Sequence, residues 1–195
     1  MKRLSWKEIA RPALMLAVIC LIVTSALAVT RAVTKGPTEE LERQQEIASR
    51  QEVLPDAASF EEMTDSGFDI NPYRGLDASG QAVGYVITTT GKGYGGSIKV
   101  MTGISADGAV TGVTILSHSE TVGLGANAEK ESFRDQYKQA VPEGGFSVYK
   151  AGQEGGDGKI LAMTGATITS DGVTGAVNQA VEIYRQIAGS GEGGN

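Results

Sequence analysis

The sequence has one cysteine and one histidine among its 195 residues. Cys20 lies inside the longest apolar run, and a single thiol excludes both an intramolecular disulfide and an iron–sulfur cluster, which usually needs four thiolates. His118 is alone, so a metal site built from several histidines is excluded too. We therefore predict no metal site, and any redox chemistry must come from an organic cofactor.

Positive charge is scarce as well. The chain carries 17 lysines and arginines against 23 aspartates and glutamates, which gives a formal net charge of −6 and a pI near 4.9. A nucleic-acid partner needs a basic surface opposite its phosphates, so the composition argues against nucleic-acid binding. The acidity excludes little else.

Charge is absent altogether from residues 12–30, PALMLAVICLIVTSALAVT. At a helical rise of about 1.5 Å per residue the run spans roughly 28 Å, close to the bilayer's hydrocarbon core of about 30 Å. It predicts one transmembrane helix that anchors the protein in the cytoplasmic membrane. The competing interpretation is a signal peptide cleaved after Ala26-Leu27-Ala28, but the run is longer than the usual apolar core of about 7–15 residues.

The basic residues that flank this span are unequally divided. Those before it are Lys2, Arg3, Lys7 and Arg11, and those after it are Arg31 and Lys35. Because cytoplasmic flanks carry the excess of lysine and arginine, residues 1–11 are predicted to be cytoplasmic and the rest of the chain extracytoplasmic.

Residues 31–80 are predicted to be a polar connection made of a helix and a loop. Residues 37–53 are rich in helix formers but show no convincing apolar stripe, which predicts a solvated helix. The remainder, residues 55–80, is predicted to be loop with a short helical piece around residues 60–63.

Alternating apolar residues predict strands in the following segment, residues 81–188. A β-hairpin is predicted over residues 96–118 around a turn at Asp107 and Gly108. Similar alternation predicts strands at residues 83–87 and 146–150.

Helical spacing of apolar residues marks two further segments. One is residues 127–140, through Phe133, Tyr137 and Ala140, and the other is a long final helix with Ser170 or Asp171 as its N-cap. We therefore predict an α+β domain, an antiparallel sheet packed against helices, followed by a flexible tail at residues 189–195. The apolar positions of the final helix are Val173, Ala176, Val177, Ala180, Val181, Tyr184 and Ile187.

Two stretches have a composition that suits a site. They are HSETVGLG (118–125), directly after a predicted strand, and TGATITS (164–170), directly before the final helix. The second suits a phosphate, because the first N–H groups of a helix are unpaired and its N-terminus carries partial positive charge. Judged on composition alone, ordinary capping and turn chemistry explains the same hydroxyls.

Both stretches resemble parts of one family. TGATITS resembles the S/T-G-A-T flavinylation motif, and GYGGSIKVMTGI (93–104) with GAVTGVTILSHSETVGLG (108–125) resembles the upstream block of the FMN-binding domain family. The whole chain resembles the G subunit of the Rnf complex, the ion-translocating ferredoxin–NAD oxidoreductase. It is also similar to the C subunit of the Na⁺-translocating NADH:quinone reductase.

The resemblance implies a covalent cofactor. FMN would be linked through a phosphoester to Thr167, attached from FAD by an external flavin transferase, so the chain needs no catalytic residue of its own. Two positions depart from the family pattern: Val122 stands where proline is frequent, and Leu161 where aspartate is frequent.

Further cofactor-binding residues are expected around Thr167. Thr164 and Thr169 are phosphate contacts or helix caps, and Gly165 and Ala166 allow close approach. The other expected residues are Glu120 and Thr121 as hydrogen-bond partners, Leu124 and Met163 as apolar walls, Tyr94 as a stacking ring, and His118 as a proton relay. For three of them a plainer role stays open: a solvent-exposed loop cap for Glu120, packing for Tyr94 and simple hydrogen bonding for His118.

Three functions remain open at this point. The first is an electron-carrying subunit of a membrane complex, whose partners are the other subunits and, during maturation, the transferase. The second is a stand-alone extracytoplasmic flavoprotein, and the third is an anchored binding module without cofactor.

Overall fold

The computed structural model describes residues 6–64 and 70–189, and it divides into two compact units, Met1–Gln44 and Gln45–Asn195. Lys2 and Arg3 lie outside the described residues, as does the predicted tail beyond Gly189.

Helix α1 runs from Trp6 to Val53, so the apolar run and the polar stretch predicted as a separate helix belong to one element. Its part Ala10–Lys35, whose most apolar 18-residue window has a mean hydropathy of 2.6, is long and apolar enough to cross a membrane. Within it the hydroxyls of Thr24 and Thr30 donate to carbonyls one turn earlier. Such bonds satisfy polar groups where no water is available.

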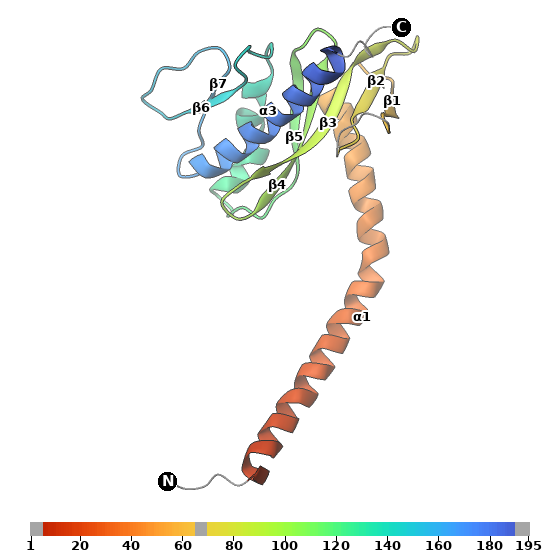
Figure 1. Cartoon of the computed structure of the whole chain (residues 1–195), viewed down its shortest axis with the longest axis vertical. Helices are drawn as coiled ribbons and strands as arrows, with labels where there is room; N and C mark the ends of the chain where they lie inside the picture. Colours follow the sequence, from red (N-terminus) through yellow and green to blue (C-terminus); the bar gives the residue numbers. More distant parts are fainter. Residues whose placement is uncertain (1–5, 65–69, 190–195) are drawn as a thin grey trace. The chain divides into compact units, whose positions relative to one another are not determined.

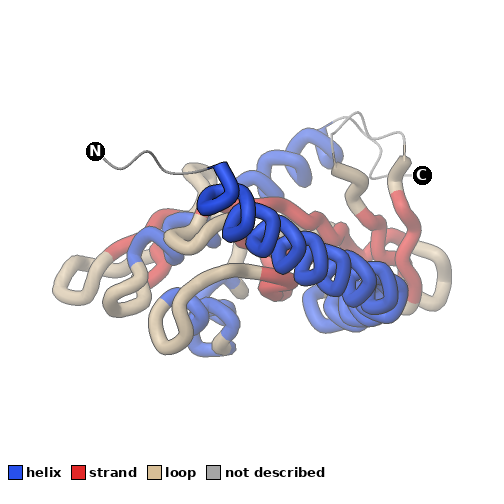
Figure 2. Tube along the Cα trace, turned by 90° about the horizontal axis from the view of Figure 1, so that it is seen from below, coloured by secondary structure: helices blue, strands red, loops and turns tan. Residues whose placement is uncertain are grey.

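Five strands form one antiparallel sheet in the order β1-β2-β3-β4-β5 (Figure 1), and Figure 2 draws the strands in red. The predicted hairpin is confirmed as β4 and β5, whose turn includes Gly108 with φ +81°. Residues 60–63, predicted helical, instead lie largely in strand β1, which pairs with β2. The bounds are β1 Ser59–Glu62, β2 Tyr73–Leu76, β3 Ala82–Lys92, β4 Ser97–Ser105 and β5 Val110–Ser117.

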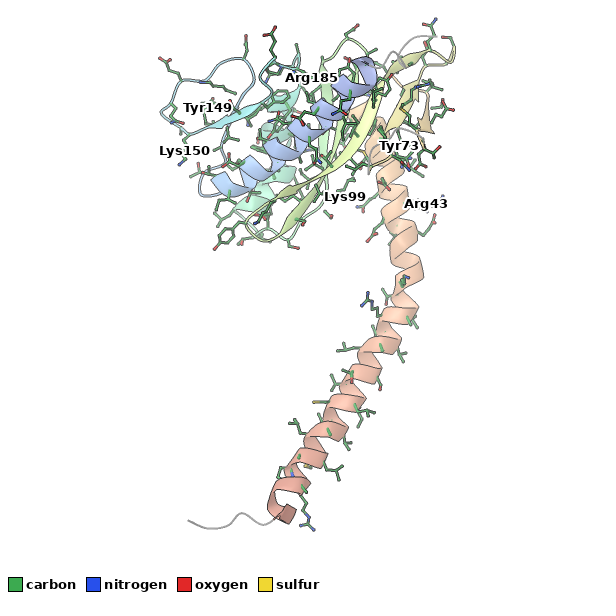
Figure 3. The ribbon with its side chains drawn as sticks, in the orientation of Figure 1. Arg43, Tyr73, Lys99, Tyr149, Lys150 and Arg185 are labelled. Carbon is green, nitrogen blue, oxygen red and sulfur yellow. The ribbon has the colours of Figure 1, made fainter. Side chains whose placement is uncertain are left out.

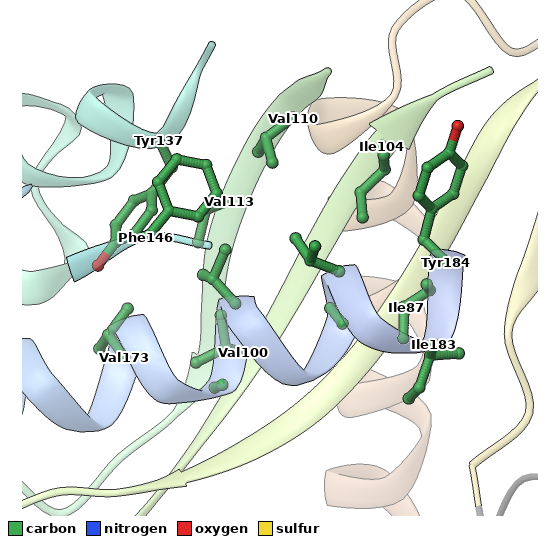
Figure 4. Close-up of a cluster of buried hydrophobic side chains, with 14 of the residues drawn as sticks. Ile87, Val100, Ile104, Val110, Val113, Tyr137, Phe146, Val173, Ile183 and Tyr184 are labelled. Carbon is green, nitrogen blue, oxygen red and sulfur yellow. The ribbon is translucent and has the colours of Figure 1, made fainter. Parts of the chain in front are cut away.

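Helix α3, Thr167–Gly189, packs on one face of this sheet. Its predicted apolar positions are buried, among them Val173, which belongs to the same main core as Val100 (both labelled in Figure 4). The helix begins three residues before the predicted cap at Ser170. The Ser170 side chain lies inside the first turn and donates to the Ala166 carbonyl, 3.0 Å away.

The end of α1 packs in a second core that includes Val86 and Met101. Residues 37–53 were predicted to be solvated, but Val53 is fully buried and its carbonyl accepts the Thr111 hydroxyl. Earlier in the same helix Glu46 forms an ion pair with Lys99, and Arg50 lies 3.5 Å above the Tyr73 ring (Lys99 and Tyr73 are labelled in Figure 3). These contacts seat the end of α1 against the sheet.

The segment between β5 and α3 is more broken than predicted. The single helix expected over residues 127–140 is replaced by three short pieces, from which Phe133 and Tyr137 are still buried in the main core. The predicted strand near residue 147 is confirmed as β6, and β7 was missed. The bounds are η1 Gly125–Glu129, α2 Glu131–Arg134, η2 Asp135–Tyr137, β6 Ser147–Tyr149 and β7 Lys159–Leu161, the last two pairing in parallel.

Candidate functional site

A cleft of about 500 Å³ opens where α3 begins. It brings together residues of the two stretches singled out from the sequence with one from the β3–β4 turn. Gly125 and Ile168 line it without having been predicted, although both lie within or beside the quoted motifs. The predicted residues that line it are Tyr94, Glu120, Thr121, Leu124, Gly165, Ala166, Thr167 and Thr169.

Two glycines allow α3 to begin against the end of β3. A Cβ on Gly91 would overlap the carbonyl of Gly172, and a Cβ on Gly172 would overlap the carbonyl of Lys92. The backbones of strand and helix therefore approach more closely than side chains permit. This contact places the first turn of α3 beside the β3–β4 turn.

The chain enters α3 through a tight turn over residues 163–166. The Ala166 N–H donates to the Met163 carbonyl at 3.0 Å, and Gly165, at the third position, has φ +75°. Such a turn requires the left-handed conformation at this position, which glycine adopts without strain. The glycine of TGAT is therefore needed for the shape of the backbone.

The helical hydrogen-bond ladder starts one turn later. Ser170 N–H donates to the Ala166 carbonyl at 3.0 Å, so the N–H groups of residues 167–169 precede the ladder. Unpaired N–H groups and the positive end of the helix dipole favour an anion at this place. The cleft thus contains a site suited to a phosphate group.

The three threonines of the motif differ in their surroundings. Thr169 is 1% exposed and donates its hydroxyl to the Glu120 carboxylate. Thr164 is exposed and lies outside the cleft lining. Thr167 is half-buried, lines the cleft and is the first residue of α3. Among the three, only Thr167 lines the cleft without being fully buried and is also the first residue of the helix.

Glu120 is a buried part of the cleft and not a solvent-exposed loop cap. It is 8% exposed, its Oε1 accepts the Gly95 N–H at 2.7 Å, and its Oε2 accepts the Thr169 hydroxyl. A Cβ on Gly93 or Gly125 would overlap the carboxylate. The first glycine of GYGG and the last glycine of GLG therefore make room for this side chain.

Three predicted residues stay outside the lining. Besides the exposed Thr164, Met163 is partly buried and packs against the main core. His118 is absent from the lining residues; its Nδ1 accepts the Glu120 N–H at 3.0 Å, and its Nε2 lies 3.1 Å from Glu129 Oε1. These contacts fit a supporting role for His118 better than a proton relay that faces the cofactor.

Apolar side chains stand around the cleft. Tyr94 is 76% exposed, and Leu124 and Ile168 are also exposed. Tyr94 does not pack in the core, so its interpretation as a packing residue is wrong. A cleft with apolar walls and a few fixed polar groups is the usual form of a site for an organic cofactor, and its volume lies within the usual range of about 300–1,000 Å³.

Comparison with known proteins matches two family descriptions. Residues 93–182 match the FMN-binding domain, and residues 1–53 match the RnfG N-terminal region. The G subunit of the Na⁺-translocating ferredoxin:NAD⁺ oxidoreductase complex of Acetobacterium woodii is 37% identical over 201 aligned positions, covering 95% of this chain and 96% of the relative. The chain belongs to the RnfG family.

A second member of the RnfG family, from Methanosarcina acetivorans, is the G subunit of an ion-translocating oxidoreductase complex. It is 36% identical, covering 90% of this chain and 94% of the relative. The crystal structure of Shewanella oneidensis NqrC shares the fold, with a TM-score of 0.52 and 22% identity over 70% of this chain and 71% of that one. The FMN-binding match begins at Gly93 and ends within α3, so it contains every residue that lines the cleft.

Proposed function

We propose that this protein is an electron-carrying subunit of a membrane-bound, ion-translocating ferredoxin–NAD oxidoreductase, with FMN esterified to Thr167. The observation that supports this most is the position of Thr167, which lines the cleft as the first residue of α3 in a chain of the RnfG family. Bound FMN supplies the ability to accept electrons and pass them on.

The cleft residues suit the parts of FMN. The turn at Gly165 and the N–H groups at the start of α3 would hold the phosphate, and the walls formed by Leu124 and Ile168 would hold the ring system. Tyr94 would cover the ring from the β3–β4 turn, and the polar groups of Glu120 and Thr121 would face the cofactor's hydrogen-bonding atoms.

Attachment is the work of an external transferase that uses FAD. The bond formed joins Thr167 Oγ1 to the phosphorus of the FMN half. The bond broken is the pyrophosphate link of FAD, so AMP leaves and the hydroxyl proton is released. Thr164 is exposed beside the acceptor, which leaves this side of the motif open to an enzyme.

The anchor places this carrier at the membrane surface. We expect the retained helix to hold residues 1–11 in the cytoplasm and the flavin domain outside, from the excess of basic residues before the span. Residues 12–30 carry no charge, so one such helix offers no path for an ion. Ion transport therefore belongs to the assembled complex.

A substitution at the acceptor tests this proposal. Thr167→Val keeps the volume and branching of the side chain but removes the nucleophilic oxygen, so the full-length protein should reach the membrane without covalent flavin. Thr169→Ser, the control, keeps the hydroxyl that Glu120 accepts and should keep the flavin. Ultraviolet fluorescence on a denaturing gel measures the covalent flavin of each variant, and an immunoblot of the same band measures its protein level. In the wild-type protein, mass spectrometry should find one FMN, less water, on the peptide 164–170.

The same preparation separates the alternatives. If the wild-type protein showed no fluorescence, the result would favour the third function, an anchored module without covalent cofactor. Fluorescent protein that purifies without other membrane subunits would instead be a stand-alone carrier. Fluorescence that survives Thr167→Val would move the attachment to another residue.

A further inference from the structure

We propose that His118 is a positioning residue that, as a neutral imidazole, holds Glu120 as a fixed negative charge beside the flavin. This inference rests on the proposed function, since it concerns the same cleft. The carboxylate of Glu120 supplies the charge, and the imidazole of His118 holds Glu120 in position.

The hydrogen bonds around His118 fix where its hydrogen is. A backbone N–H only donates, so Nδ1, which accepts the Glu120 N–H at 3.0 Å, carries a lone pair. The hydrogen of the neutral ring is then on Nε2, which donates to Glu129 Oε1 at 3.1 Å. The imidazole thereby joins the main chain of Glu120 to the short helix η1, which contains Glu129.

The carboxylate of Glu120 is held from the other side by two donors. Gly95 N–H approaches Oε1 at 2.7 Å, and the Thr169 hydroxyl donates to Oε2. Both partners donate, so each carboxylate oxygen accepts one hydrogen bond and the side chain is held in one orientation. Gly93 and Gly125 pack closely against it, because a Cβ on either would overlap the group.

This charge has no opposing charge in the cleft wall. Among the described residues that line the cleft, Glu120 carries the only carboxylate, and none is a lysine or an arginine. An electron added to a flavin in the cleft meets this negative charge in a partly desolvated place, where Coulomb interactions exceed those in water. Glu120 should therefore lower the flavin's midpoint potential. This effect depends on the position of the carboxylate, which His118 helps to fix by holding the main chain of Glu120.

Two substitutions of His118 separate its contacts. His118→Asn puts an amide oxygen close to the place of Nδ1 and keeps an acceptor for the Glu120 N–H. His118→Gln reaches toward Glu129 with its amide group but loses that acceptor. We measure the midpoint potential of the covalent flavin in the full-length protein by redox titration. Glu120→Gln and His118→Gln should shift it to more positive values, and His118→Asn should leave it close to the wild-type value.

A second measurement uses no flavin. In full-length protein carrying Thr167→Val, hydrogen exchange at the Glu120 amide is followed by NMR. His118→Gln should speed this exchange by up to about tenfold, because the amide loses its acceptor, and His118→Asn should not. This result does not depend on which residue carries FMN, so it stands even where the attachment at Thr167 fails.

The outcomes decide the proposal. Unchanged exchange and unchanged potential in His118→Gln would overturn the role of His118. An unchanged or more negative potential in Glu120→Gln would overturn the role of the charge. A His118→Asn variant that behaves like His118→Gln would show that overall packing matters, and not the Nδ1 acceptor, and would overturn the positioning role as well.

Discussion

Thr169 donates its hydroxyl to the carboxylate of Glu120, 49 positions earlier in the chain, and so ties the first turn of α3 to the loop after β5. Both side chains are buried. Thr169→Val removes the donor and leaves Glu120 Oε2 without this partner, which costs about 1–3 kcal/mol of unfolding free energy. We expect lower stability together with retained covalent flavin, because Thr167 is untouched.

Urea unfolding of full-length Thr169→Val, followed by circular dichroism, measures the first effect, and gel fluorescence measures the second. Thr169→Ser, which keeps the hydroxyl, should behave as wild type in both. Loss of flavin from Thr169→Val with unchanged stability, together with flavin retained in Thr167→Val, would show that Thr169, and not Thr167, carries the cofactor.

The close contact between β3 and α3 gives a second prediction. Gly172→Ala forces a Cβ into the carbonyl of Lys92, which is backbone and has little room to yield. Overpacking of this kind typically costs about 1–3 kcal/mol, more than the gain of about 1 kcal/mol from the better helix former. The variant should unfold at lower urea concentration and load less flavin, because the start of α3 moves away from the cleft.

Gly175 is the matched control. It is exposed in the same helix, and a Cβ there would meet nothing within 4 Å. Gly175→Ala should therefore raise the unfolding free energy by about 0.5–1 kcal/mol. Equal effects of the two substitutions would show that the helix tolerates side chains against β3.

Much of this fold could be predicted from local patterns. The alternation through residues 98–104 and the turn at Gly108 gave the hairpin, and the helical spacing from Val173 onward gave α3. The membrane span also follows from a local property, the absence of charge. Each of these signals arises from neighbours within one element.

What the sequence did not show depends on distant partners. Strand β7 is short, and Gln136 completes its edge by accepting the Leu161 N–H at 2.6 Å, which no local pattern predicts. The start of α3 was placed too late because Ser170 looks like a cap, whereas it supports the turn before the helix. The cleft residues were found mostly through resemblance, and the position of His118 behind Glu120 required the three-dimensional arrangement.

The orientation of the anchor gives a third prediction. Residues 12–30 are uncharged, and the basic residues are more numerous before them than after them. A phosphatase reporter that works only outside the cytoplasm should be active when fused after Asn195. Reversing the bias, by Arg11→Glu and Lys7→Glu with added lysines after Lys35, should reduce that activity. A strictly cytoplasmic reporter that is active after Asn195 would contradict the proposed topology.

The last prediction concerns a tyrosine in the main core. Tyr137 is fully buried between Phe133 and Phe146, with its hydroxyl 2.7 Å from Thr174 Oγ1. The Thr174 hydroxyl donates to the Ser170 carbonyl at 2.8 Å, so Tyr137 must be the donor to Thr174. Tyr137→Phe removes this bond and costs about 0.5–1.5 kcal/mol near neutral pH.

The loss of unfolding free energy caused by Tyr137→Phe should disappear at alkaline pH. Burial raises the pKa of Tyr137 above its ordinary value of 10, so the folded protein keeps this proton to higher pH than the unfolded chain. Above about pH 10 the unfolded chain binds fewer protons, and the free energy of unfolding therefore falls as the pH rises. Phenylalanine has no proton to lose, so between about pH 8 and pH 11 wild-type protein should lose more stability than Tyr137→Phe. Urea unfolding at both pH values measures this difference, and an equal loss in the two proteins would assign the alkaline sensitivity to other groups, such as Tyr184, whose pKa is also raised by burial.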